Sequence, residues 1–143
     1  MKYILCIALF SFSFIGCIND GSLKPVIPNN IINANSAKTW VKTVHIENGV
    51  NKTPLMKELR TTFTLYENGT FREQKYAHIG SNLGKKGSYS LAIPTLTDTV
   101  FTFFYSNSEP ISFEVKYIDL EEIRLTNDSM SWTLETLKPP KLK

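Results

Sequence analysis

The nine residues Phe63-Thr64-Leu65-Tyr66-Glu67-Asn68-Gly69-Thr70-Phe71 give the clearest indication of the fold. Apolar and polar side chains alternate before the Asn-Gly pair, and an aromatic residue follows it. Asn-Gly supplies the positive φ values that a two-residue type I′ turn requires. The stretch therefore predicts a β-hairpin whose strands each have one apolar face.

Alternation with a period of two extends from this hairpin across most of the chain. One apolar and one polar face per strand are typical of an antiparallel sheet that is wetted on one side. Eight short strands in series favour an all-β fold, an eight-stranded antiparallel up-and-down barrel, and a two-sheet β-sandwich is the alternative. One helical turn is expected within residues 52–57, capped by Thr53. The predicted strands are residues 38–46, 59–66, 69–77, 86–93, 98–105, 111–118, 121–126 and 130–137.

The interior of such a barrel is either filled by side chains or just wide enough for one small ligand. Aromatic walls suit an apolar or ring-bearing ligand, and rings that simply pack against one another are the alternative. The alternation points nine aromatic side chains inward as a candidate ligand-binding lining: Trp40, Phe63, Phe71, Tyr89, Phe101, Phe103, Phe113, Tyr117 and Trp132.

The composition of the chain excludes several classes of protein. Its 143 residues are enough for one domain, and its formal charge of +3 comes from basic and acidic residues that are interspersed. Without a basic stripe we expect no nucleic-acid partner. Both cysteines, Cys6 and Cys17, lie in the first 17 residues. The domain therefore has neither a disulfide framework nor a thiolate metal site.

Catalytic patterns are absent from the sequence. His45 and His78 show no metal-ligand spacing and are expected on the surface. The acidic residues around Asp119 lack the spacing of a calcium loop. No nucleophile elbow or phosphate loop occurs. We therefore predict no enzyme activity, no catalytic residue, no metal and no cofactor. Residues 72–75, Arg-Glu-Gln-Lys, interrupt the alternation, which is compatible with a place at the barrel mouth, a contact with a partner or a mobile edge strand.

The first sixteen residues predict a signal peptide. A positive charge at Lys2 precedes a largely apolar run over residues 4–15, which is shorter than the roughly 20 residues of a membrane span. The run ends in Phe14-Ile15-Gly16-Cys17, which resembles the bacterial lipobox. That resemblance implies cleavage after Gly16 and lipidation of Cys17 with diacylglycerol and an acyl chain such as palmitate. Two or more chains anchor a protein stably.

The segment after the cysteine predicts a tether. Residues 17–37 mix Asn, Gly, Ser and Pro without a period, so we expect a lipidated cysteine and flexible linker before a barrel domain at 38–138 and a basic tail at 139–143. Ile18 stands where some bacteria place an aspartate that retains lipoproteins in the inner membrane. The expected location is the cell envelope, at the outer membrane, on its periplasmic face or on the cell surface.

Residues 39–137 resemble the lipocalin-like domains of bacterial lipoproteins. The resemblance includes Trp40 at the start of the first strand, the hairpin of residues 63–71, the Gly87-Ser88-Tyr89 strand start and the run from Phe113 to Leu125. Lys38 departs from the family, which usually has glycine two residues before the tryptophan. The resemblance implies a barrel closed at one end with a cavity for a small apolar ligand.

Two hypotheses about function follow. The first is a membrane-anchored, non-enzymatic lipoprotein that binds a small apolar ligand or serves as an envelope accessory factor. The second is a protein-interaction module, an inhibitor, an immunity-type factor or an assembly subunit, built on a barrel filled by side chains. A cavity lined by the named aromatic residues would favour the first, and a filled barrel with exposed apolar residues would favour the second.

Overall fold

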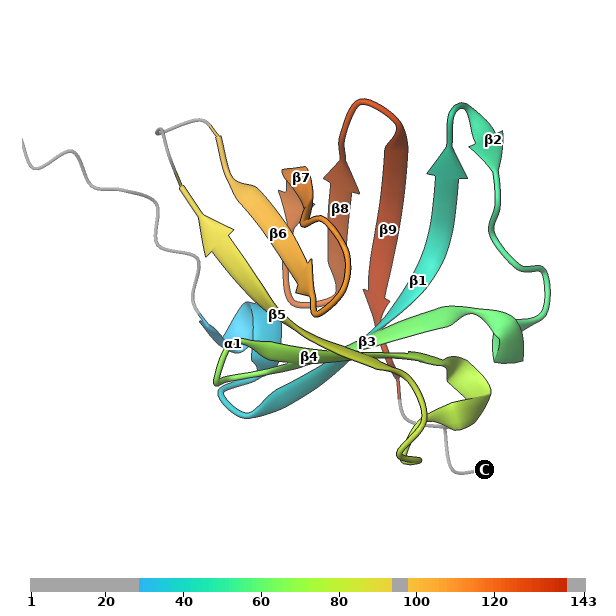
Figure 1. Ribbon diagram of the computed structural model, residues 1–143, viewed down its shortest axis with the longest axis vertical. Coiled ribbons are helices and arrows are strands. Elements are labelled where there is room, and N and C mark those ends of the chain that lie inside the picture. Colours follow the sequence, from blue (N-terminus) through green and yellow to red (C-terminus); the bar gives the residue numbers. More distant parts are fainter. Residues whose placement is uncertain (1–28, 94–97, 139–143) are drawn as a thin grey trace, which may run out of the picture.

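The computed structural model describes residues 29–93 and 98–138, which form one β-barrel (Figure 1). Helix is confined in this part of the chain to one short α-helix, α1 (Asn29–Asn33), and two 3₁₀ turns, η1 (Lys57–Leu59) and η2 (Tyr76–His78). No helix within these ranges is long and apolar enough to cross a membrane. The strands are β1 (Ala37–Glu47), β2 (Val50–Asn51), β3 (Thr61–Tyr66), β4 (Thr70–Lys75), β5 (Lys85–Ala92), β6 (Val100–Tyr105), β7 (Ile111–Ile118), β8 (Glu122–Thr126) and β9 (Met130–Thr136).

The sheet closes on itself. Each long strand pairs antiparallel with the next in the order β1-β3-β4-β5-β6-β7-β8-β9, and β9 pairs back with β1 from Trp40–Thr136 to Glu47–Met130. β2 is a two-residue addition beside the end of β1. This closure confirms the predicted eight-stranded up-and-down barrel and excludes the two-sheet sandwich, because a sandwich leaves the first and last strands unpaired with each other.

Apolar side chains from the eight strands meet in one core inside the barrel. Every second residue of a strand points inward, so six of the eight strands contribute an aromatic ring to this core. The fully buried side chains with the largest volumes are Trp40, Phe63, Phe71, Phe101, Phe103 and Phe113. A core this aromatic explains how a small domain without disulfides in its described part gains its stability.

Two β-bulges change which side chains face the core. One lies in β1 between Lys42 and Val44, and the other in β7 between Val115 and Tyr117. A bulge inserts one extra residue, so the alternation after it runs in the opposite phase. Tyr117 therefore points outward and is 44% exposed, and the prediction that it lines the interior was wrong. Ile118 packs against the core in its place.

The same effect in β1 overturns the expectation for His45. Its ring lies 5.9 Å from that of Trp132 in an edge-to-face arrangement, rather than on the outer surface. The bulge after Lys42 places both Lys42 and His45 on the inner side of one strand, although they are three residues apart. Alternation alone assigns two such residues to opposite faces.

One end of the barrel, here called the plugged end, is covered by α1 (Figure 1). The indole Nε1 of Trp40 donates a hydrogen bond to the carbonyl oxygen of Ile32 at 2.9 Å. The side chain of Asn33 donates to the hydroxyl of Tyr89, which itself donates to the carbonyl oxygen of Tyr66. Ile32 and Asn33 are buried. The predicted tether over residues 17–37 was therefore wrong from residue 29 onward, and residues 17–28 lie outside the described part.

The opposite end, here called the distal end, carries η1 and η2. In Figure 1 these turns lie at the far end of β3 and β4 from α1. The backbone N–H of Tyr76 donates to the carbonyl oxygen of Arg60, which joins the two loops. The helical turn expected at 52–57 begins instead at Lys57, and the hydroxyl of Thr53 accepts from the backbone N–H of His45 rather than capping it.

The Asn-Gly turns also differ from expectation. Asn68 does not have a positive φ, and the backbone N–H of Gly69 donates to the carbonyl oxygen of Tyr66, so a three-residue loop joins β3 and β4. The Asn68 side chain accepts from Thr70 instead. The two-residue turn with positive φ at both positions is Asn48-Gly49, between β1 and β2. The hairpin was predicted correctly and its turn type was not.

Candidate functional site

Eight of the nine predicted lining residues share the interior, and Tyr117 does not. Seven of the eight are buried, and Tyr89 is half-buried against them. Their rings contact one another: the centroids of Phe113 and Trp132 are 4.4 Å apart, and those of Phe101 and Phe103 are 4.8 Å apart. Rings at these distances pack face or edge against each other. The aromatic side chains therefore fill the middle of the barrel.

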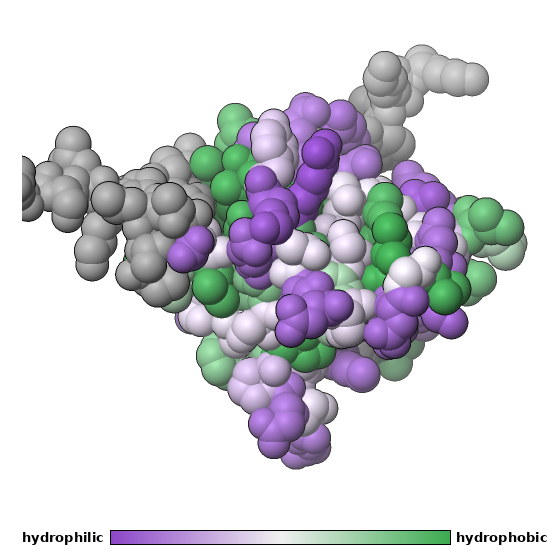
Figure 2. Space-filling view, turned by 90° about the horizontal axis from the view of Figure 1, so that it is seen from above, coloured by the Kyte–Doolittle hydropathy of each residue, from purple (hydrophilic) through white to green (hydrophobic). Residues whose placement is uncertain are grey.

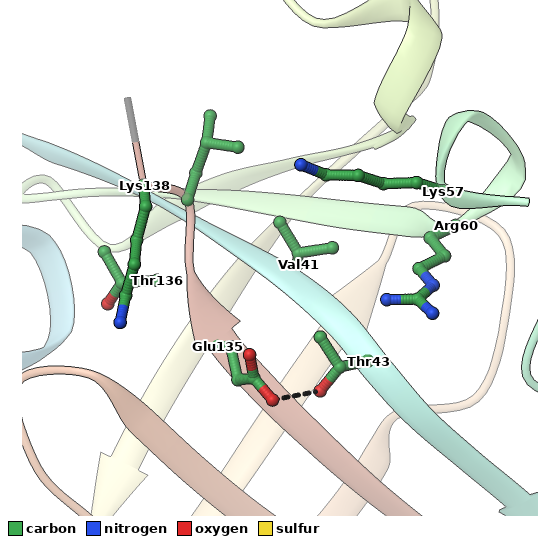
Figure 3. Close-up of a pocket in the computed structure, with 8 residues that line it drawn as sticks. Val41, Thr43, Lys57, Arg60, Glu135, Thr136 and Lys138 are labelled. Carbon is green, nitrogen blue, oxygen red and sulfur yellow. Dashed lines mark hydrogen bonds between the residues drawn. The ribbon is translucent and has the colours of Figure 1, made fainter. Parts of the chain in front are cut away.

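Several hollows lie on the outer wall and at the loops of the described structure. One of about 340 Å³ occurs where β1 leaves β3 after the Val41–Thr62 pair (Figure 3). We call it the basic groove. Its floor is Val41 and Thr43, and the hydroxyl of Thr43 donates to the carboxylate of Glu135 at 3.0 Å. Its lining is completed by Lys57, Arg60, Thr136, Leu137 and Lys138.

The groove carries more positive than negative charge. Lys57 and Arg60 enter from the distal loop (Figure 3), and neither forms an ion pair within the described residues. Lys138 pairs with Glu121, an exposed contact that contributes little. The Nζ of Lys57 lies 4.6 Å from the centroid of the Tyr76 ring, which orients it. The groove can therefore accept a negatively charged group.

Apolar side chains protrude beside the groove on the loop between β2 and β3. Leu55 is 97% exposed, and Met56 and Leu59 are more than half exposed. Leu83 and Ile79 add exposed apolar area on the neighbouring loop of residues 76–84. On the face shown in Figure 2, hydrophobic residues appear as separate patches among hydrophilic ones. We call Leu55, Met56, Leu59, Ile79 and Leu83 the distal apolar rim.

The interior at the distal end is polar, whereas the predicted lining contained aromatic residues alone. Lys42 is only 8% exposed, and its Nζ lies 4.1 Å from the centroid of Trp132 and 5.8 Å from that of Phe63. The hydroxyl of Tyr105 donates to the Glu73 carboxylate at 2.7 Å. Lys42 lies two residues after Trp40, and Glu73 lies two residues after Phe71. Residues two apart in a strand face the same side of the sheet, so the sequence already indicated that both polar side chains point inward.

Two ring nitrogens at this end are buried without a hydrogen-bond partner among the described residues, His45 Nε2 and Trp132 Nε1. Burial lowers the pKa of Lys42 to about 8, against the opposing effect of Glu73. Burial, reinforced by Lys42, also lowers the pKa of His45. Burial and the adjacent Glu73 carboxylate raise the pKa of Tyr105. We call Lys42, His45, Glu73, Tyr105 and Trp132 the interior polar cluster.

The polar run of residues 72–75 has a structural explanation. Glu73 faces the interior, whereas Gln74 faces outward and is buried under the loop of residues 76–84. The amide of Gln74 donates to the carbonyl oxygens of His78, Ser81 and Leu83. Arg72 donates to the same loop. The polar outer face of β4 therefore holds this loop against the barrel, and His78 belongs to it.

Within residues 29–93 and 98–138, no three histidine, cysteine, aspartate or glutamate side chains gather closely enough to hold a metal ion.

Comparison with known proteins gave no match among protein-family models, curated proteins or solved structures. Fold and site together define a small closed β-barrel with a filled aromatic interior, a basic groove and an apolar rim at its distal end.

Proposed function

We propose that this protein is a lipid-anchored, non-enzymatic interaction module that binds an acidic protein segment at its distal end. The observation that carries the proposal is the filled interior, because rings in mutual contact occupy the middle of the barrel and leave binding to its outer wall and its ends. The basic groove supplies positive charge, and the distal apolar rim supplies exposed apolar area beside it. Exposed apolar patches rimmed by polar residues mark protein-interaction sites.

Charge reversal in the groove tests the proposal. Arg60→Glu should abolish a defined crosslink between the protein and its partner in intact cells, formed by a photoreactive residue at position 55. Lys116→Glu is the matched control, because Lys116 lies on β7, away from β1, and its ion-pair partner among the described residues is the exposed Glu114. Equal crosslinking in both variants would reject the groove as the binding surface.

The lipoprotein part of the proposal rests on residues 1–28, outside the described structure. Diacylglycerol and a further acyl chain such as palmitate on Cys17, after removal of a signal peptide ending at Gly16, would hold the barrel at the outer membrane. Replacing Cys17 with serine should move the protein into the soluble fraction of the cell envelope. Retention of the Cys17→Ser protein in the membrane fraction would contradict the anchor.

The resemblance to lipocalin-like domains supports a second candidate, small-ligand binding, but not at the predicted depth. The buried, unpartnered nitrogens of His45 and Trp132 favour the distal mouth rather than the aromatic middle. Native mass spectrometry of protein purified from its own cells separates the two candidates. A retained compound of low mass would favour the ligand, and a stoichiometric protein partner would favour the interaction module.

A further inference from the structure

Lys42 is the one lysine that is buried among the described residues, and it lies inside the barrel rather than at its surface. Its side chain extends along the aromatic core toward the distal end. The Nζ lies over the Trp132 ring at 4.1 Å from its centroid, with Phe63 at 5.8 Å. The contact with the two ring faces fixes the amine while leaving its hydrogen-bonding capacity unused.

The amine makes no hydrogen bond and no ion pair with any residue in the described ranges. Its neighbours are aromatic rings, with charged side chains at longer range. Glu73 and Glu47 lie close enough to favour its charged form, and Lys75 disfavours it. The carboxylate of Glu73 is already bound by the Tyr105 hydroxyl. A lysine that is buried against aromatic rings and has no direct hydrogen-bond or ion-pair partner is the arrangement that makes an amine nucleophilic.

His45 lies beside Lys42 on the same strand, across the β1 bulge, and both contact the Trp132 ring. Its Nε2 is buried and has no partner in the described structure. A neutral imidazole in this position can accept a proton and return it, which is the assistance that imine formation needs.

We propose that Lys42 binds a small aldehyde or ketone covalently, as a Schiff base, at the distal mouth of the barrel. The lone pair of the neutral amine forms a bond to the carbonyl carbon, and the electrons of the broken C=O π bond move to oxygen. The nitrogen loses two protons in all, the oxygen gains them and leaves as water, and a C=N bond replaces C=O. No oxidant or reductant takes part.

The acidity of the amine supports this chemistry. With the pKa of Lys42 lowered to about 8, roughly one amine in ten is neutral at pH 7. An exposed lysine of ordinary pKa has roughly one in 3,000 neutral at the same pH. The lower intrinsic nucleophilicity of a weaker base offsets part of this gain, so we expect Lys42 to react about 10-fold faster than an exposed lysine.

The test is reductive trapping on the purified protein. Acetaldehyde and cyanoborohydride at pH 7, followed by peptide mass mapping, should modify Lys42 about 10-fold faster than Lys116, which serves as an internal reference within the same molecules. A small probe suits a residue that is only 8% exposed. Modification of Lys42 no faster than that of Lys116 would overturn the proposal, and this comparison needs no variant that has to fold.

Two variants and a pH series sharpen the result. Lys42→Arg keeps the cation and its contact with the rings, so selective labelling should disappear while the circular dichroism spectrum is retained. His45→Gln should slow labelling of Lys42 several-fold and leave that of Lys116 unchanged. The labelling rate of Lys42 should level off above about pH 8, while that of Lys116 keeps rising. The titratable groups that act on Lys42 are Glu73, Lys75, Glu47 and His45. A parallel rise of the labelling rate with pH at both lysines would contradict the proposal, because the Lys42 amine would then titrate like an exposed lysine.

Discussion

The two tryptophans of the barrel have the same local arrangement and opposite surroundings. A lysine Nζ lies 4.1 Å above each ring, Lys38 above Trp40 and Lys42 above Trp132. At the plugged end, Trp40 donates its N–H to Ile32, and Lys38 donates to the carbonyl oxygens of Ile31 and Leu120. At the distal end, the Trp132 N–H is buried without a described partner, and the Lys42 amine makes no hydrogen bond to a residue in the described ranges. The Trp40–Lys38 pair therefore stabilises the fold through hydrogen bonds. The Trp132–Lys42 pair keeps donors that could still bind a ligand.

This difference suggests that the plugged end serves mainly the stability of the barrel and the distal end its function. Buried polar groups are almost always hydrogen-bonded, and each exception needs an explanation such as a catalytic role or an unseen water or ion. The plugged end satisfies its groups through α1, whereas the distal end combines unpartnered nitrogens with exposed apolar loops. The proposed partner site and the proposed Schiff-base lysine both fall at the distal end.

The largest expected effect is loss of the plug. Trp40→Ala removes a fully buried ring and the hydrogen bond to Ile32, and should lower the free energy of unfolding by about 3–5 kcal/mol. Urea denaturation measures it. Phe104→Ala, on the outer face of β6 and 40% exposed, is the control and should change the stability by less than about 1 kcal/mol. Similar losses in both variants would mean that Trp40 has no special role.

A smaller effect is expected from replacing the unpartnered lysine. The pKa of Lys42 is lowered in the folded state from 10.5 to about 8, so between these values the unfolded chain binds more protons and stability rises with pH. Below about pH 8 the cost of burying the charge is fully present. Lys42→Met should therefore stabilise the protein at pH 7 by about 1–3 kcal/mol.

The pH dependence identifies the source of that gain. The advantage of Lys42→Met over the natural protein should shrink between about pH 8 and 10. Above pH 10 the raised pKa of Tyr105 acts in the opposite direction, so measurements stop there. A difference between the two proteins that stays constant from pH 7 to 10 would mean that packing, not charge, is responsible.

The smallest effect comes from comparing the same substitution in the two tryptophans. Trp40→Phe leaves the Ile32 carbonyl without its donor, whereas Trp132→Phe removes a donor that has no described acceptor. We expect Trp40→Phe to cost about 1–2 kcal/mol more in chemical denaturation, since an unpaired buried group carries a desolvation cost. Equal costs would show that a water or ligand already satisfies Trp132.

The fold was accessible from the sequence because alternation is a local signal. Phe63 and Leu65 lie on one face whatever the rest of the chain does, and the turn at Asn68-Gly69 joins neighbours in sequence. The closure of β9 on β1 was inferred from the strand count, and it is what the structure shows.

The candidate site was not accessible in the same way. A bulge is a local irregularity without a fixed sequence pattern, and one bulge reversed Tyr117 while another brought His45 inside. The plug was missed because Asn30-Ile31-Ile32-Asn33 has no helical period; the burial of Ile32 depends on the barrel end that it covers. The basic groove needs Arg60 and Glu135 together, which only the folded sheet provides.

The position of α1 has a mechanical consequence. The helix lies between everything upstream of residue 29 and the first long strand, and it is attached to the barrel by the indole of Trp40 and the packing of Ile32. β1 is hydrogen-bonded to neighbours on both sides. A force applied along the N-terminal segment would detach this small helix from the barrel first. The hydrogen bonds between β1 and its neighbouring strands would come under force only after α1 had detached.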